Sequence, residues 1–222
     1  MVLTVLQAAI QLQFNNYWHC GSGRGSGSLV DAVCERDGEG LPYVPGRQLK
    51  GILRHAVRRA EAWGWLDAIK LPSGPLRSHE ELLFGSKSQD VGKFMTYPGM
   101  LLVDNGKLPE ADRAWLNRPH MMALKEQFFE ELYSTAINEM GTAKAHSLRG
   151  IEVCLPVTLQ AQLALQVTAL DSLQRQQQQD WMEVSSPWKA LRTALPLIDA
   201  LGAHRSRGLG EAEVSFVTTT GR

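Results

Sequence analysis

The sequence predicts an α+β fold of the ferredoxin-like or RNA-recognition-motif (RRM) type, with a thumb or lid segment inserted into its core. Residues 8–14 and 157–168 alternate between apolar and polar side chains, the period of half-buried strands. Residues 49–60 form an amphipathic helix, and a second helix followed by a strand closes the chain. The resulting order is strand, helix, strand, inserted segment, strand, helix, strand, which is typical of that fold.

The first strand is expected at residues 8–14, where Ile10, Leu12 and Phe14 share one side. The Gly/Ser-rich residues 21–28 are predicted to form a loop, because glycine lets a backbone lie close to a ligand. A short apolar run at 30–35 and a turn at 36–40 then lead into the first helix.

That helix is the best-defined element of the sequence. Its apolar residues recur at i, i+3, i+4, i+7, i+8 and i+11: Leu49, Ile52, Leu53, Ala56, Val57 and Ala60. The opposite side carries Arg47, Lys50, Arg54 and Arg58 in one line. Such a stripe is either a solvated charged face or an anion-binding surface. We favour the second interpretation, because the stripe holds no acid to pair with.

The chain changes character between residues 72 and 149, where Pro, Gly and Ser interrupt it. Within this segment a short strand is expected at 100–103 and a helix-rich piece at 121–140. We therefore assign residues 1–71 and 151–222 to the core and residues 72–150 to the insertion.

The alternation returns from Val157 onward and predicts a long strand that is solvated on one face. The glutamine-rich residues 174–180 are expected to form a loop. A helix follows with Pro187 in its first turn, and Pro196 kinks or restarts it. A glycine-rich turn at 202–210 leads to the final strand, 212–216.

Composition excludes several classes of protein. The 23 basic and 23 acidic residues cancel, so any nucleic-acid contact needs locally clustered Arg and Lys. No run of about 18 apolar residues occurs, and the N-terminal residues lack a basic leader, so we expect a cytoplasmic protein without a membrane partner. Three cysteines without a C-x-x-C pair suggest reduced thiols, and zinc is expected only if the fold gathers His and Cys. P-loop, Rossmann, nucleophile-elbow and H-E-x-x-H patterns are absent.

Several motifs carry a family resemblance. They are His19-Cys20-Gly21-Ser22-Gly23, then Asp31, Arg36-Asp37, the run GLPYVPGRQLKG at 40–51, and Ser206-Arg207-Gly208-Leu209-Gly210 before the closing strand. In this order they resemble the signature of the RAMP superfamily of CRISPR-associated proteins. Within that superfamily they are most similar to the repeated backbone subunit of type III effector complexes, the Csm and Cmr kind. A weaker likeness at 141–156 corresponds to part of a protruding thumb.

The resemblance implies a subunit that coats the guide portion of a CRISPR RNA together with copies of itself and other effector subunits. Active members cut the paired target RNA with one loop aspartate, which by position is Asp31. A lone carboxylate is a weak base, so Asp31 is expected to hold a divalent cation, Mg²⁺ or alternatively Mn²⁺. The other interpretation of Asp31 is a turn or capping residue. Asp37, between Arg36 and Gly38, is interpreted as a turn residue.

The expected RNA-binding residues come from four regions: the first loop, the first helix, the inserted segment and the glycine-rich turn before the last strand. They are His19, Ser22, Arg47, Lys50, Arg54, Arg58, Lys144, Arg205 and Arg207. His19 is equally compatible with a packed, backbone-bonded ring. Arg47 and Gln48 stand where the family usually has small hydroxyl residues, and the insertion lacks the cysteines with which many members hold zinc. Two alternative functions remain: a non-catalytic CRISPR RNA scaffold, and a standalone guide-processing endoribonuclease that uses His19 without metal.

Overall fold

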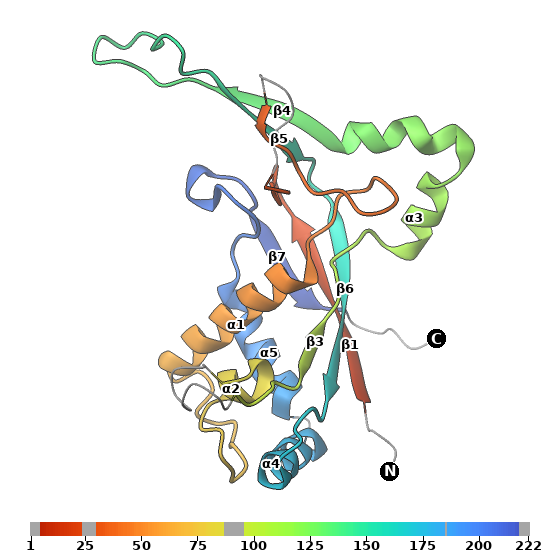
Figure 1. Ribbon diagram of the computed structural model, residues 1–222, viewed down its shortest axis with the longest axis vertical. Coiled ribbons are helices and arrows are strands. Elements are labelled where there is room, and N and C mark those ends of the chain that lie inside the picture. The colour runs from red at the N-terminus through yellow and green to blue at the C-terminus, as the bar shows by residue number, and fades with distance from the viewer. Residues whose placement is uncertain (1–4, 24–29, 87–95, 185, 218–222) are drawn as a thin grey trace.

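The computed structural model describes residues 5–23, 30–86, 96–184 and 186–217 of the 222-residue chain. Its core is a four-stranded antiparallel sheet with the order β3-β6-β1-β7 (Figure 1). The strands are β1 (Val5–Phe14), β3 (Leu101–Val103), β6 (Thr158–Gln166) and β7 (Ala212–Phe216). With helix α1 (Gly46–Ala62) after β1 and helix α5 (Ser186–Ala194) before β7, this is the ferredoxin-like arrangement that the sequence predicts.

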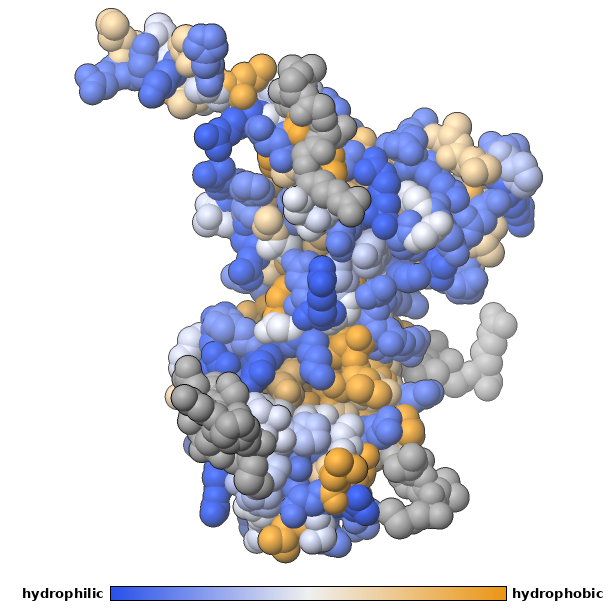
Figure 2. Space-filling view, viewed as in Figure 1, coloured by the Kyte–Doolittle hydropathy of each residue, from blue (hydrophilic) through white to orange (hydrophobic). Residues whose placement is uncertain are grey.

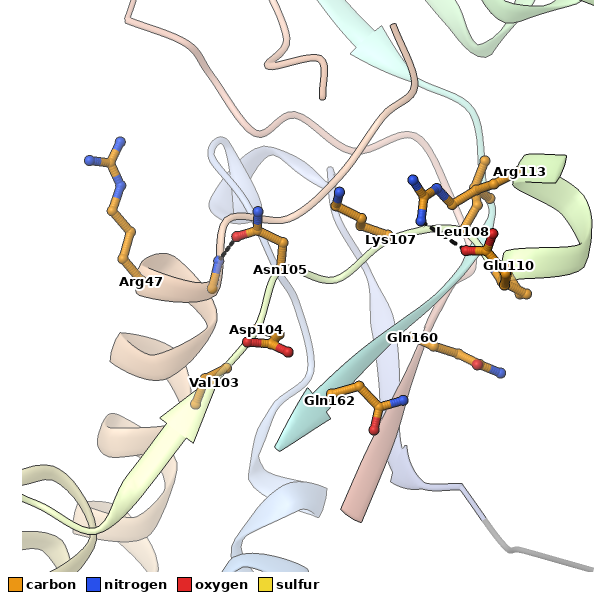
Figure 3. Close-up of a pocket in the computed structure, with 12 residues that line it drawn as sticks. Arg47, Val103, Asp104, Asn105, Lys107, Leu108, Glu110, Arg113, Gln160 and Gln162 are labelled. Atoms are coloured by element: carbon orange, nitrogen blue, oxygen red, sulfur yellow. Dashed lines mark hydrogen bonds and ion pairs between the residues drawn. The ribbon is translucent and has the colours of Figure 1, made fainter. Parts of the chain in front are cut away.

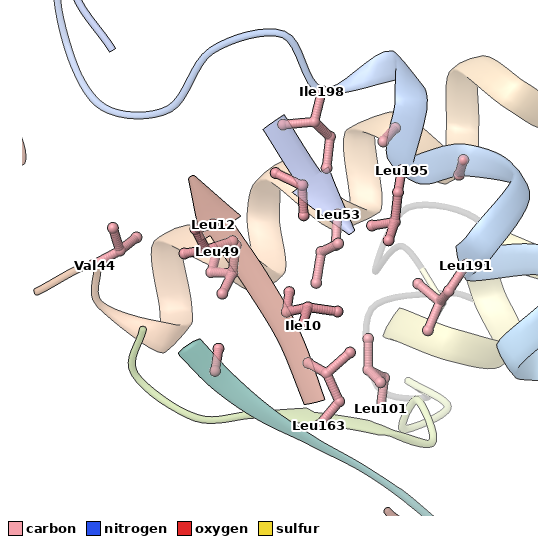
Figure 4. Packing of buried hydrophobic residues seen from close by; sticks show 14 of the residues in the cluster. Ile10, Leu12, Val44, Leu49, Leu53, Leu101, Leu163, Leu191, Leu195 and Ile198 are labelled. Carbon is pink, nitrogen blue, oxygen red and sulfur yellow. The ribbon is translucent and has the colours of Figure 1, made fainter. Parts of the chain in front are cut away.

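The alternation in the strands divides the sheet into two faces. Ile10 lies opposite Ala161 and Leu12 opposite Leu159, and all four are buried beneath the helices. Leu49 and Leu53 of α1 pack against this face (Figure 4). The other face is polar and carries Gln11 opposite Gln160. The predictions for β1, β6, β7 and α1 are therefore confirmed.

The segment expected as an insertion also contributes to the core. Strand β3 pairs with β6, and helix α2 (His79–Phe84) packs against α1. After β3 come helix α3 (Glu110–Leu116), the 3-10 segment η1 (Pro119–Phe128) and strand β4 (Phe129–Ser134). The prediction of a helix-rich piece at 121–140 is thus wrong for its second half, where β4 pairs with β5 (Arg149–Cys154).

A second sheet with the order β2-β5-β4 stands above the core, and β2 spans Val30–Ala32. The β4–β5 hairpin projects away from the rest of the molecule (Figure 1). In the space-filling view its tip forms an isolated arm (Figure 2). The residues at 141–156, where the sequence resembles part of a protruding thumb, lie mostly in this hairpin.

The loop predicted at 174–180 is wrong, because these residues belong to helix α4 (Ser172–Glu183). The Asp171 carboxylate caps this helix by accepting hydrogen bonds from two backbone N–H groups. Gln177 is buried and its amide donates to the C=O groups of Pro72 and Leu76. Gln177 therefore supplies hydrogen bonds to the backbone of a neighbouring loop, a role that composition does not reveal.

The C-terminal helix is interrupted where the sequence predicts. Helix α5 ends at Ala194, and the 3-10 turn η2 (Leu195–Leu197) contains Pro196. A further 3-10 turn, η3 (Arg205–Arg207), lies in the glycine-rich turn before β7. None of the described helices is long and apolar enough to cross a membrane.

Candidate nucleic-acid interface

Three parts of the chain pack on residues 15–22, which continue from β1 beyond the core sheet. Residues 33–35 hydrogen-bond with residues 20–22. Trp18 and Cys154 of β5 exchange backbone hydrogen bonds at 3.1 and 2.7 Å, and these bonds join the base of the β4–β5 hairpin to residues 15–22. The glycine-rich loop 202–210 is bonded to residues 17–19 through two further backbone N–H groups. The loops that the sequence singles out thus meet at one end of β1. Of the Gly/Ser stretch at 21–28, residues 24–28 lie outside the described residues.

Asp31 lies in this region with an exposed side chain. Its neighbours Val30 and Ala32 pair with Gly150 and Ile151 of β5, and the register shifts between them at Asp31. Such an irregularity re-aims a side chain away from regular pairing. Arg149 is the first residue of β5, directly before Gly150, and it is also exposed. An arginine thus begins the strand that pairs with β2, the strand of Asp31. Sequence reasoning did not assign Arg149, since its place next to β2 depends on long-range pairing.

The donor set around Asp31 limits which cation it could hold. Within the described ranges, no group of three or more His, Cys, Asp or Glu residues could hold a metal ion. Mg²⁺ is commonly bound through one or two carboxylates, with waters and substrate phosphate oxygens as its other ligands. Asp31 could therefore hold Mg²⁺ or Mn²⁺ only as a single carboxylate ligand, with RNA phosphate oxygens and waters as the other ligands.

The structure buries His19, one of the residues expected to contact RNA. The residue is 3% exposed, and its Nδ1 lies 2.6 Å from the C=O oxygen of Glu152 and 3.4 Å from Cys34 Sγ. A Cβ at Gly21 would lie 2.7 Å from His19 Nε2, so the glycine makes room for the ring. The structure corresponds to the packed, backbone-bonded alternative.

The three cysteines gather around this histidine. A hydrogen bond with Cys154, together with His19, lowers the pKa of Cys34 to about 6 even though burial opposes it. The hydrogen bond with Cys34 raises the pKa of His19, while burial raises the pKa of Cys20 to about 12. Cys34 Sγ lies 3.4 Å from His19 Nδ1 and 3.2 Å from the Glu152 C=O oxygen, so this buried cluster fastens residues 19–34 to β5.

Glu152 is the centre of the hairpin base. Its carboxylate accepts two hydrogen bonds from Arg36 at 2.8 and 2.9 Å and one from the Cys34 N–H at 2.8 Å. The Arg36 guanidinium also lies 3.7 Å from the centre of the Phe129 ring on β4. These contacts fix the arm relative to the loop that bears Asp31.

Ser22 and Asp37 have local partners. The Ser22 hydroxyl lies 3.2 Å from the Val33 C=O oxygen. The Asp37 carboxylate accepts hydrogen bonds from the N–H groups of Glu39 and Leu41 at 2.9 and 3.0 Å. Asp37 is therefore the turn residue that the sequence predicts.

The helix stripe is not free of acids, so the argument that favoured anion binding is wrong. Glu80 of α2 reaches it: Arg54 Nε lies 2.7 Å from Glu80 Oε1, and Arg58 donates to both Glu80 oxygens at 2.6 and 2.8 Å. These arginines, Arg58 first, lower the pKa of Glu80 to about 2. Lys50 Nζ donates to the Leu101 C=O at 2.7 Å, and burial lowers its pKa. Three of the four stripe residues thus fasten α1 to its neighbours.

Arg47 differs from the other stripe residues because it is exposed and has no ion pair within the part of the chain that the structure describes. It lines a groove of about 600 Å³ with Asn105 and Lys107 (Figure 3). The Gly46 N–H at the start of α1 donates to Asn105 Oδ1 at 2.7 Å. The first N–H group of α1 is thus already hydrogen-bonded to Asn105. The exposed Arg47 side chain can bind an anion.

The glycine-rich loop presents the clearest free cations. Arg205 and Arg207 are exposed, and neither forms an ion pair with a described residue. Left-handed residues flank them, His204 with φ 58° and Gly208 with φ 83°. Asn16 donates to the Gly208 C=O at 2.9 Å and holds the loop against the continuation of β1.

Lys144 lies at the far end of the hairpin arm, where it is exposed. Together with Asp31, Arg205 and Arg207 it is among the expected site residues that the fold leaves accessible. The arm and the glycine-rich loop therefore offer two separate exposed cationic positions.

Comparison with known proteins identifies the family. The model of the RAMP superfamily matches residues 11–213, so the chain belongs to the RAMP superfamily. Two similar solved structures are a type III-B Cmr-beta complex in the apo state and a type III-B Cmr-beta complex bound to cognate target RNA. The first is 10% identical with a TM-score of 0.57, over 96% of this chain and 98% of that one. The second is 8% identical with a TM-score of 0.61, over 95% and 97%. No curated protein matches the chain.

Proposed function

We propose that this protein is a CRISPR RNA-binding backbone subunit of a type III effector complex, and that it cleaves target RNA at Asp31. Its partners are CRISPR RNA, target RNA, copies of itself and other effector subunits in the cytoplasm. The RAMP family membership and the fold shared with chains of Cmr complexes support the subunit role. The observation that carries the cleavage proposal is the exposed Asp31 at the irregular β2–β5 pairing.

The chain's own residues suggest a division of labour. Arg205, Arg207 and Arg47 bind phosphates through exposed guanidinium groups, and Lys144 extends the contact along the arm. Asp31 orients the ribose beside the scissile phosphate. The 2′-oxygen gives its proton to water and bonds to phosphorus, the bond from phosphorus to the 5′-oxygen breaks, that oxygen takes a proton from water, and a cyclic phosphate remains. Mg²⁺ or Mn²⁺ held by Asp31 would supply polarisation of the hydroxyl and charge neutralisation at the phosphate.

A non-catalytic scaffold is the second candidate. The observation that favours it is that, among the described residues, no group of three or more His, Cys, Asp or Glu residues could hold a metal ion. Standalone guide processing through His19 loses support, because the ring is buried and bonded to the backbone of β5.

The test uses the assembled complex with a guide-matched target RNA. Asp31→Ala and added EDTA should each abolish cutting, while guide RNA retention stays unchanged. Asp112→Ala, an exposed aspartate on α3, is the matched control and should cut normally. An inert wild-type complex selects the scaffold. Metal-independent cutting of precursor RNA by the isolated chain, lost in His19→Ala, selects guide processing.

A further inference from the structure

Among the described strands, β7 forms one edge of the core sheet and pairs with β1 alone. Backbone groups of a strand point alternately to its two sides. Val217 donates to the Ala9 C=O, and Asn15 donates to the Glu211 C=O, so the odd-numbered residues of β7 face β1. The N–H and C=O groups of Val214 and Phe216 consequently point away from the sheet.

Only the beginning of this edge is covered within the described chain. The Ala212 N–H donates to the Asp199 C=O at 3.0 Å, and Ala200 forms a bridge with Glu211. The segment leading into the glycine-rich loop thus closes the edge as far as Ala212. Along the rest of β7, no backbone hydrogen bond from another described residue reaches the outward groups of Val214 and Phe216, so they can accept an added strand.

A groove of about 600 Å³ runs beside this open edge. Its lining includes Leu195, Pro196 and Ile198 of the η2 region, together with consecutive residues of β7. Phe216 forms part of the lining and contacts two side chains of α5. The centres of the Phe216 and Trp188 rings lie 6.0 Å apart in an edge-on arrangement, and the Arg192 guanidinium lies 4.8 Å from the centre of the Phe216 ring. A strand edge beside an apolar helix surface suits an extended peptide.

The rim of the groove is acidic. Asp199, Glu211 and Glu213 are exposed, and none of the ion pairs among described residues includes their carboxylates. The one cation in the lining, Arg192, lies over the Phe216 ring. Charge complementarity therefore favours a basic occupant and excludes a nucleic-acid phosphate chain.

We propose that the open edge of β7 binds an extended basic segment of a partner protein as a fifth strand of the core sheet. On β7, Val214 points toward the helices and Glu213 points to the polar face. Residues of an added strand alternate in the same way, so apolar side chains contact Leu195 and Ile198 while lysine or arginine side chains lie beside Glu213. The recognised segment alternates apolar and basic residues.

The experiment titrates the full chain with a synthetic Lys-Val-Lys-Val-Lys-Val peptide and follows backbone amide signals by NMR. We expect the largest shifts at Val214 and Phe216. Glu211→Lys combined with Glu213→Lys should weaken binding at least tenfold, whereas Glu183→Lys, an exposed site on α4, should not. A peptide N-methylated at alternate residues should also bind at least tenfold more weakly, because it cannot complete the ladder.

Three results overturn the proposal. The first is equal affinity for a scrambled or N-methylated peptide, which indicates charge attraction without an added strand. The second is a set of amide shifts that excludes β7. The third is concentration-dependent self-association that involves Val214 and Phe216 and blocks the peptide, which assigns the edge to a second copy of this chain.

Discussion

Replacing Glu80 by glutamine removes the charge that holds Arg54 and Arg58 of α1. The pKa of Glu80 is lowered from 4.5 to about 2, which corresponds to roughly 3 kcal/mol at about 1.4 kcal/mol per pKa unit. The Arg58 side chain is 47% exposed, and solvent screening reduces the gain, so we expect a loss of about 2 kcal/mol in the free energy of unfolding at pH 7.

The same pair makes a prediction about pH. A carboxylate with a lowered pKa in the folded state stabilises the protein above its unfolded pKa, and this stability is lost as pH falls through the folded pKa. The contribution should therefore disappear between about pH 5 and pH 2. Urea unfolding at pH 7, 4 and 2 measures it. The gap between wild type and Glu80→Gln should shrink toward low pH, while Glu183→Gln should match wild type throughout. A gap that is absent at pH 7 or constant with pH refutes the reasoning.

Three further predictions concern the interface. Arg205→Ala with Arg207→Ala should reduce the slope of log affinity against log salt for single-stranded guide RNA by about 1.4, since each lost phosphate contact contributes about 0.7. Gly21→Ala should cost about 1–3 kcal/mol in urea unfolding, because the new Cβ lies 2.7 Å from a ring nitrogen of His19. Arg36→Met should cost about 2–4 kcal/mol and speed amide exchange at the hairpin base, because it leaves a carboxylate without its bidentate partner.

Each of these predictions has a matched control. Arg54→Ala should lower stability and leave the salt slope unchanged, because the structure gives that arginine to Glu80. Gly38→Ala should be nearly neutral, since a Cβ there meets nothing within 4 Å. Arg118→Met removes an exposed arginine and should change unfolding by less than about 0.5 kcal/mol. An Arg54→Ala variant with a reduced salt slope would contradict the assignment of the stripe to the fold.

The elements that sequence reasoning found are those whose burial repeats with a regular period. Leu49 and Leu53 on α1, and Ile10 and Leu12 on β1, are all buried where the 3.6- and 2-residue patterns place them. Helix α4 was not predicted, because several of its buried residues are glutamines that serve as hydrogen-bond partners. Polar side chains in the core carry no hydrophobic period, so pattern analysis reads them as loop.

The site was harder to predict because its contacts join distant segments. Arg205 and Arg207 are exposed, as expected for arginines in a glycine-rich loop that has few side chains for them to pack against. The pairing of Glu80 with α1 spans 22 to 26 residues across an intervening loop, and the pairing of Glu152 with Arg36 spans 116. No local pattern encodes which acid meets which base, so the sequence does not reveal that Glu80 pairs with Arg54 and Arg58 of the stripe.

The polar face of the core sheet separates this chain from the usual RNA-recognition mode of its fold. RRM sheets stack bases on aromatic side chains. Here Gln11 lies opposite Gln160, Gln13 opposite Thr158 and Ala9 opposite Gln162, so the central strands offer neither rings nor cations there. Accessible positive charge instead lies on loops, the helix start and the arm. Binding through those positions is dominated by phosphate contacts, which hold an RNA without reading its sequence. The guide-coating role proposed above requires that property, because such a subunit must accept guides of any sequence.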